Sequence, residues 1–270
     1  MKKFLLMSAL LFSGSVFANS SCSDNAFRAW EKDSNQFRNS LFWTCDSYPA
    51  DDSLEVMLYH TWVDGKDGER HLMLRVLLVK TETPAVVASG NLHIWEGPNI
   101  RVREGDYDPE AFIIDSTNYP LNETTNAFAI LADIAGDNYC SDIVRDQFVT
   151  LFVREGKALK PVLKHLPLQQ RYVVEGTACD RYGDKKTLHG QGQLSLADTK
   201  TNGYRDLILS TETVTDVYDQ SSMEELSEAE MLEEESSGIE TKIYKTTLKF
   251  DGHRYPVKWE ELPAKEWWQL

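Results

Sequence analysis

Short apolar runs separated by polar turns recur along most of this chain, a pattern typical of β-strands rather than of helices. The clearest case is residues 54–62 (LEVMLYHTW), which a turn rich in glycine and aspartate (64–68) separates from residues 71–79 (HLMLRVLLV). Two apolar runs on either side of such a turn predict a long β-hairpin.

The same pattern continues to the end of the chain, with polar turns between the apolar runs. We therefore expect an all-β or β-dominated body of antiparallel sheets. The further strands are expected at Ala85–Trp95, Ala111–Asp115, Ala127–Ile134, Phe148–Arg154, Ala158–Leu163, Arg171–Glu175, Gly190–Leu196, Leu207–Glu212, Lys242–Phe250 and Arg254–Lys258.

Residues 23–43 have a different pattern. Phe27, Trp30, Phe37, Leu41 and Phe42 stand in a charged and polar background at loosely helical spacing. This spacing predicts an N-terminal helix that covers one side of the β-rich body.

A second helical pattern lies in an acidic region between residues 206 and 241, which holds twelve acidic residues and no Lys or Arg. Ser221 and Glu224 form a capping-box pattern, which predicts a helix within an acidic insertion at 220–237. The insertion is either a solvated loop or a docking element for a basic partner. The predicted partner-binding residues are Met223, Glu224, Glu225, Leu226, Glu228, Glu230, Met231, Leu232, Glu233, Glu234 and Glu235.

The first eighteen residues have the pattern of a secretory signal peptide. Lys2 and Lys3 precede an apolar core, Phe4–Phe12, and Val16 and Ala18 occupy the positions that a signal peptidase recognises. No later stretch approaches the ~20 apolar residues that a membrane-spanning helix needs. We therefore expect an exported, periplasmic protein without membrane insertion.

The chain has four cysteines: Cys22, Cys45, Cys140 and Cys179. An even number of cysteines in an exported protein favours two disulfides over free thiols. Three pairings are possible, and we favour the local one, Cys22–Cys45 with Cys140–Cys179. The alternative, a metal site, lacks any Cys-x-x-Cys pair.

Charge narrows the classes of partner. The formal charge of −15 becomes −17 when Lys2 and Lys3 leave with the signal peptide. Such a surface repels nucleic acid and anionic lipid headgroups and favours a basic protein as partner. The oligomeric state is open.

Residues 198–207 (DTKTNGYRDL) resemble the aspartate-rich loop of FG-GAP β-propeller repeats. That resemblance implies calcium ligands at Asp198, Asn202 and Asp206, with a sharp turn at Gly203. Lys200 departs from the pattern, because an ammonium group repels a divalent cation at this position. We therefore expect no metal and no cofactor.

Three further stretches resemble uncharacterised exported β-rich proteins of Gram-negative bacteria: TLFVREGKALKPVL (150–163), ADTKTNGYRDLILS (197–210) and TTLKFDGHRYPV (246–257). The resemblance implies compartment and fold, not an activity. The first and third also resemble each other, which is compatible with two duplicated sheet modules. We accordingly divide the chain into a signal peptide (1–18), a helix plus β module (19–125) and a second β module (126–270).

Catalytic signatures are sparse. The sequence has no Gly-x-Ser-x-Gly elbow, and its six histidines form no His-x-His or His-x-x-x-His pair. The expected function is therefore that of a non-enzymatic exported binding protein, which neutralises a basic envelope-targeting enzyme or toxin as an inhibitor or immunity protein does. The alternatives are a periplasmic hydrolase acting on glycans and a structural or assembly factor of the envelope.

Overall fold

A computed structural model describes residues 22–34, 43–64, 70–94, 111–133, 140, 142–180, 184–218 and 241–258. It confirms the predicted β-dominated fold with an N-terminal helix. The elements are α1 (Asp24–Ser34), β1 (Trp43–Ser47), β2 (Leu54–Asp64), β3 (Arg70–Lys80), β4 (Val86–His93), β5 (Phe112–Pro120), β6 (Asn126–Ala132), β7 (Ile143–Glu155), β8 (Ala158–Glu175), β9 (Lys185–Thr201), β10 (Tyr204–Tyr218) and β11 (Thr241–Leu248).

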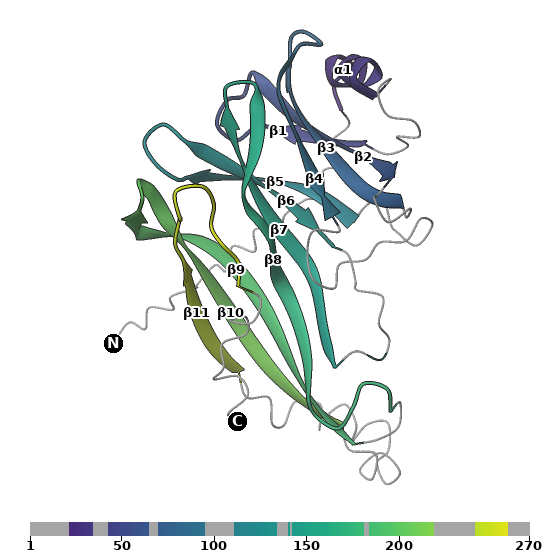
Figure 1. Ribbon diagram of the computed structural model, residues 1–270, viewed down its shortest axis with the longest axis vertical. Coiled ribbons are helices and arrows are strands. Elements are labelled where there is room, and N and C mark those ends of the chain that lie inside the picture. Colours follow the sequence, from purple (N-terminus) through teal and green to yellow (C-terminus); the bar gives the residue numbers. More distant parts are fainter. Residues whose placement is uncertain are drawn as a thin grey trace, which may run out of the picture.

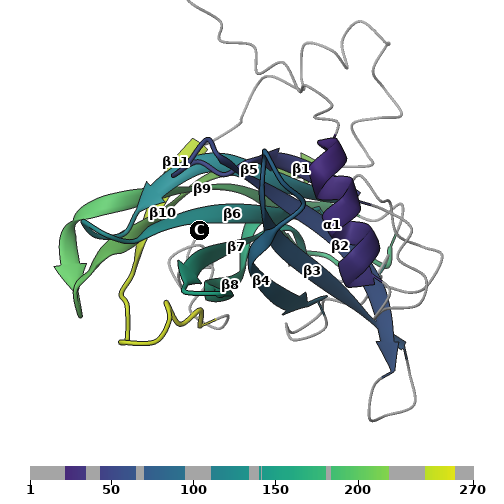
Figure 2. The ribbon, with the colours of Figure 1, turned by 90° about the horizontal axis from the view of Figure 1, so that it is seen from above.

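All eleven strands belong to one sheet, which consists of two antiparallel meanders (Figure 1). Strands β1 to β4 pair in sequence order, and so do strands β5 to β11. The meanders meet where β4 pairs with β8 in parallel, at Ser89 and Ala158. The sheet curls until β1 approaches β5, so it is nearly barrel-shaped (Figure 2).

Strand β8 holds this arrangement together because it has different neighbours along its length. It pairs with β7 throughout, with β4 at Ala158, and with β9 from Gln169 onward. Pro161 and Pro167 lie between these two junctions, where the described residues pair with the second side of β8 only through an isolated bridge from Tyr255 to Leu163. A proline is tolerated there because no ladder hydrogen bond needs its missing N–H.

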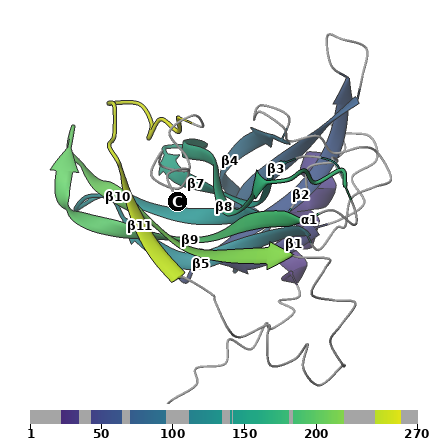
Figure 3. The same ribbon diagram turned by 90° about the horizontal axis from the view of Figure 1, so that it is seen from below.

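Figure 3 shows the curled sheet from below. A hydrophobic core lies on each of its two faces. One fills the inside of the curl, with residues such as Val56, Leu74 and Phe128. The other fills the space between β6–β8 and β9–β11, with residues such as Leu151 and Leu209. Successive side chains of the strands that the two cores share point alternately into one core and the other. These strands are therefore apolar on both faces.

Helix α1 packs on the outer face of β2 and β3. Ala26 and Ala29 are buried there against Met57 and Leu77. Ser23 caps the helix, since its hydroxyl accepts a hydrogen bond from Ala26 N at 3.1 Å. The predicted helix over residues 23–43 is confirmed from Asp24 to Ser34; residues 35–42 lie outside the described residues, and Trp43 begins β1.

The structure differs from one of the predicted strand assignments, and another prediction falls outside the described residues. The predicted strands 158–163 and 171–175 are both parts of β8. The predicted helical insertion at 220–237 lies outside the described residues. The predicted module boundary at 125 and 126 falls at the β5–β6 turn, where Thr125 O accepts hydrogen bonds from Leu121 N and Asn122 N. The division into modules stays a prediction.

Candidate functional site

The segment predicted to bind a partner connects β10 with β11. Its predicted contact residues, Met223 to Glu235, fall within 219–240, outside the described residues. The described residues fix where the segment leaves and rejoins the sheet: β10 ends at Tyr218, β11 begins at Thr241, and Val214 pairs with Thr241. The acidic segment, residues 219–240, is therefore the connection of an antiparallel hairpin.

Five strands begin or end near this hairpin connection, at what we call the distal end of the sheet. The register places Ile143 of β7 beside Tyr172 of β8, and Lys185 of β9 beside Tyr218 of β10. Figure 1 shows these ends in the lower part of the molecule, whereas α1 lies at the top. The acidic segment therefore starts far from the helix.

Exposed apolar side chains border the acidic segment on both sides. Val217 immediately precedes the end of β10 and is 71% exposed, and Ile243 near the start of β11 is 66% exposed. They are the most exposed large hydrophobic residues of the described part of the chain, where the next, Val86, is 40% exposed. Ile243 pairs with Glu212, five residues before Val217, so the two side chains lie on opposite faces of the sheet. Each is a single apolar side chain beside the acidic segment that a partner of this segment can bury, and single exposures of this kind are common on protein surfaces.

The hairpin that carries the acidic segment rests on a small apolar cluster. Tyr172 and Leu188 are buried, and Val174 and Tyr244 pack against them. On the β9–β10 pair, His189 Nε2 lies 3.0 Å from Asp216 Oδ2. These contacts attach β10 and β11 to the body up to the point where the described residues stop.

The distal end also holds two of the four cysteines. Cys140 and Cys179 are exposed free thiols, and Cys179 Sγ lies 3.4 Å from Cys140 O. The disulfide predicted between them is thus not formed in the structure, although the two residues are adjacent. The predicted Cys22–Cys45 disulfide is confirmed, with a Cα–Cα distance of 5.0 Å.

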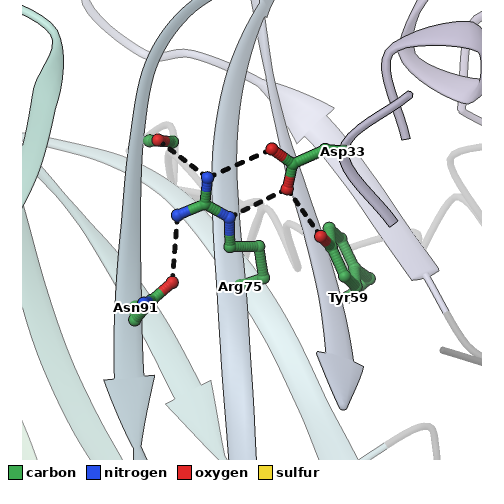
Figure 4. A network of polar contacts seen from close by, with 5 residues as sticks. Asp33, Tyr59, Arg75 and Asn91 are labelled. Carbon is green, nitrogen blue, oxygen red and sulfur yellow. Dashed lines mark hydrogen bonds and ion pairs between the residues drawn. The ribbon is translucent and has the colours of Figure 1, made fainter. Parts of the chain in front are cut away.

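A network of polar side chains joins the C-terminal end of α1 to the sheet (Figure 4). Asp33 accepts hydrogen bonds from the Tyr59 hydroxyl at 2.6 Å, from Arg75 Nε at 2.9 Å and from Arg75 Nη2 at 3.1 Å. The same guanidinium donates to Asn91 Oδ1 at 3.0 Å and to Ser89 Oγ at 3.1 Å. We call these five residues the helix clamp.

The helix clamp is suited to holding charges rather than to moving protons. Burial raises the pKa of Asp33, but the hydrogen bonds from Arg75 and Tyr59 lower it more, so the net pKa is below the usual range. Burial and Asp33 raise the pKa of Tyr59, and the hydrogen bond to Asp33 raises that of Arg75. All three groups keep one protonation state near neutral pH, so the clamp lacks a general acid or base poised for catalysis.

Sequence analysis missed the helix clamp. Tyr59 and Arg75 are 26 and 42 residues from Asp33, and no local motif links them. The available signal was Arg75 itself, the one charged residue within the apolar stretch 71–79. A charge in such a strand needs a partner, because burying it alone is costly.

Each of the calcium candidates has another partner within the protein. Asn202 and Gly203 form the two-residue turn between β9 and β10, with φ of 50° and 84°. The Asn202 amide donates to Phe250 O, Asp198 contacts Arg205 Nη2 at 3.4 Å, and buried Asp206 accepts from the Thr199 hydroxyl. The Asn-Gly sequence is thus explained by a hairpin turn.

The described ranges contain no group of three or more His, Cys, Asp or Glu side chains placed to hold a metal ion. Within those same ranges, no helix has the length and apolar character needed to cross a membrane. Comparisons with protein-family models, curated proteins and solved structures find no match for this chain.

Proposed function

We propose that this protein is an exported, periplasmic binding protein that neutralises a basic envelope-targeting enzyme or toxin. The observation that carries the proposal is the distal hairpin. Its connection, residues 219–240, has nine acidic and no basic residues, and its two roots each carry an exposed apolar side chain. This arrangement is non-catalytic and requires no cofactor.

The charge of the acidic segment accounts for recognition at a distance. Nine carboxylates within 22 residues attract a cationic surface over a Debye length of about 8 Å at physiological ionic strength. Steering of this kind raises the association rate more than it raises affinity. A basic active-site cleft is the kind of target that such a segment can cover.

Apolar burial accounts for retention of the partner. Val217 and Ile243 flank the segment, and Met223, Leu226, Met231 and Leu232 lie within its sequence. Binding energy in interfaces concentrates in a few buried anchors, surrounded by contacts of small effect. We therefore expect the apolar residues to determine the dissociation rate and the glutamates to determine the association rate.

The proposal is tested with the mature chain and defined basic enzymes of the envelope, beginning with a c-type lysozyme. A basic protein without an envelope target, cytochrome c, controls for non-specific charge attraction. We expect one-to-one inhibition of a target enzyme, without inhibition by a variant lacking residues 220–237. Equal inhibition by the intact and shortened forms would contradict the assignment of the acidic segment.

Matched variants separate charge from shape. Glu224→Lys, Glu225→Lys, Glu228→Lys and Glu230→Lys together should slow association at least tenfold at low salt and flatten its salt dependence. The corresponding four Glu→Gln changes should give an intermediate rate. Val217→Ser with Ile243→Ser should instead accelerate dissociation, while Val86→Ser, on the other meander, should leave both rates unchanged.

A further inference from the structure

We infer that Cys140 and Cys179 form a thiol–disulfide exchange site at the distal end, which cycles between the dithiol and an intramolecular disulfide. Its substrate is a disulfide of low molecular mass or the disulfide of a dithiol carrier protein. This inference is independent of the partner of the acidic segment. It rests on proximity, exposure and a backbone anchor that holds the two residues together without a covalent bond.

Proximity is the first observation. Cys140 and Cys179 are separated by 39 residues, yet Cys179 Sγ lies 3.4 Å from the carbonyl oxygen of Cys140. The strands between them, β7 and β8, return the chain to the same end of the sheet. Two thiols held this close react as an intramolecular pair, with a high effective concentration.

The anchor is the second observation. Asp142 Oδ1 accepts hydrogen bonds from Ala178 N at 2.8 Å and from the Thr177 hydroxyl at 3.3 Å. Its backbone oxygen accepts from Val173 N at 2.8 Å. Asp142 therefore joins the chain before β7 to the turn after β8, and it keeps Cys179 beside Cys140 when both are thiols.

Exposure is the third observation, and the other cysteine pair provides the contrast. Cys45 is 1% exposed beneath α1 and already forms a disulfide with Cys22. Cys140 and Cys179 are both exposed, so a disulfide substrate can reach them. Disulfides that are accessible exchange readily, whereas buried structural ones resist reduction.

The reaction balances without a cofactor. One of the two thiolates attacks a sulfur of R–S–S–R, forms a mixed disulfide and releases one thiolate RS⁻. The other cysteine then attacks the protein sulfur of the mixed disulfide, closes the Cys140–Cys179 bond and releases the second RS⁻. The two protons lost by the cysteines convert both leaving groups into RSH, and the reverse sequence reduces the pair.

The Cys140 thiol affects the rate at which Cys179 can react. Cys140 raises the pKa of the Cys179 thiol, with smaller contributions from burial and from Asp142. Because the thiolate is the nucleophile, uncatalysed oxidation at neutral pH should be slow and should need time to reach equilibrium.

The test equilibrates the folded mature chain in mixtures of reduced and oxidised glutathione. Free thiols are then alkylated and the four cysteines are quantified by peptide mass spectrometry. We expect Cys140 and Cys179 to lose their thiols together in one two-electron transition, while Cys22 and Cys45 stay bonded throughout. Persistence of both thiols at the most oxidising ratio, or separate glutathione adducts on each, would overturn the inference.

Two matched sets of variants address the steps. Cys140→Ser should trap a mixed disulfide on Cys179, and Cys179→Ser should trap one on Cys140, with the far-ultraviolet circular dichroism unchanged. Asp142→Ala should lower the equilibrium constant for closing the disulfide about tenfold, since it removes two hydrogen bonds of the anchor. Asp142→Asn keeps an acceptor oxygen and should largely restore that constant; equal constants for all three chains would refute a positioning role for Asp142.

Discussion

The α1 end and the distal end of this molecule hold the same kinds of chemical group in opposite ways. At the α1 end, Cys45 is buried in a disulfide and the Arg75 guanidinium has three side-chain partners. At the distal end, two cysteines are exposed thiols, and apolar side chains such as Val217 face solvent. The side chains named at the α1 end have their partners within the protein, whereas those named at the distal end are exposed to solvent.

This difference shows that residue type does not decide the role of a position. Cysteines form a buried disulfide beneath the helix and are accessible thiols at the far end, because the two ends differ in burial and not in sequence context. The same contrast predicts where substitutions will affect stability and where they will affect binding or exchange. Four changes test it, in order of decreasing effect on the free energy of unfolding.

Removing the disulfide at the α1 end should have the largest effect. Cys22→Ala with Cys45→Ala opens a loop with a sequence separation of 23, for which the loop-entropy model gives about 3 kcal/mol. Urea unfolding under non-reducing conditions measures the loss. A loss below about 1 kcal/mol would mean that the helix clamp alone holds α1 in place.

Acidification should destabilise the protein through His60, which lies in β2 with its side chain 95% buried on the side of the inner core. Burial lowers its pKa from 6.5 to about 4. The unfolded imidazole binds a proton near pH 6.5 and the folded one does not. The contribution of His60 to the free energy of unfolding is therefore constant above about pH 7 and falls by roughly 3 kcal/mol between pH 6.5 and pH 4.

Urea unfolding at several pH values between 7.5 and 4.5 tests this dependence. His60→Gln should remove most of the slope in that interval. His189→Gln, which alters an exposed histidine, is the matched control and should leave the slope intact. A slope of equal size in all three chains would assign the effect to other groups.

Disrupting the helix clamp should cost roughly 2 kcal/mol. Arg75→Met leaves the Asp33 carboxylate, whose side chain is 13% exposed, with only the Tyr59 hydroxyl as donor. Breaking a buried pair is costly because one charge remains uncompensated, and partial exposure reduces that cost. Adding Asp33→Leu should recover part of the loss. No recovery in the double variant would show that packing of the arginine stem, and not charge, is responsible.

The clamp also has a defined dependence on pH. The folded pKa of Asp33 is depressed, so its stabilising contribution is present above the unfolded pKa near 4 and is lost as the pH falls through the folded value. The difference in stability between the wild type and Arg75→Met should therefore narrow below pH 4.

Removing the distal thiols should have the smallest effect. Cys140→Ser with Cys179→Ser should change the stability of the reduced protein by less than about 0.5 kcal/mol, because both residues are exposed. Thermal unfolding in the presence of a reductant measures this change. A loss as large as that from the Cys22–Cys45 pair would remove the distinction between the two ends.

Much of the fold followed from the sequence, and the misses have physical causes. The hairpin of β2 and β3 was predicted because its two apolar runs and the Gly-Asp turn between them are local signals. Strand β8 was predicted as two pieces, with a gap at residues 164–170, because Pro167 is a turn signal unless the second side of the strand is unpaired, which only the tertiary structure shows. The Asn202–Gly203 turn resembles an ion-binding loop in sequence because both structures need a sharp turn.

The candidate site was predicted less completely. The acidic segment stands out in the sequence by charge alone. The apolar residues at its roots do not, because Val217 and Ile243 belong to alternating strands in which half of the residues are normally buried. The adjacency of Cys140 and Cys179 was predicted by the favoured one of three pairings, but whether they carry a bond depends on geometry that spacing does not contain.

The single parallel pairing between the two meanders has a consequence for folding kinetics. All other strand pairs among the described residues join strands that follow each other in sequence. Each meander can therefore form through contacts of low sequence separation before β4 pairs with β8. The pairing of β4 with β8 places Gly90 against Leu159, where a Cβ added to Gly90 would lie 2.3 Å from the backbone oxygen of Leu159. Gly90→Ala should therefore accelerate unfolding and leave the folding rate nearly unchanged in a chevron experiment. The contacts that form last would then be the first to break, and the junction of β4 with β8 would determine the lifetime of the native state.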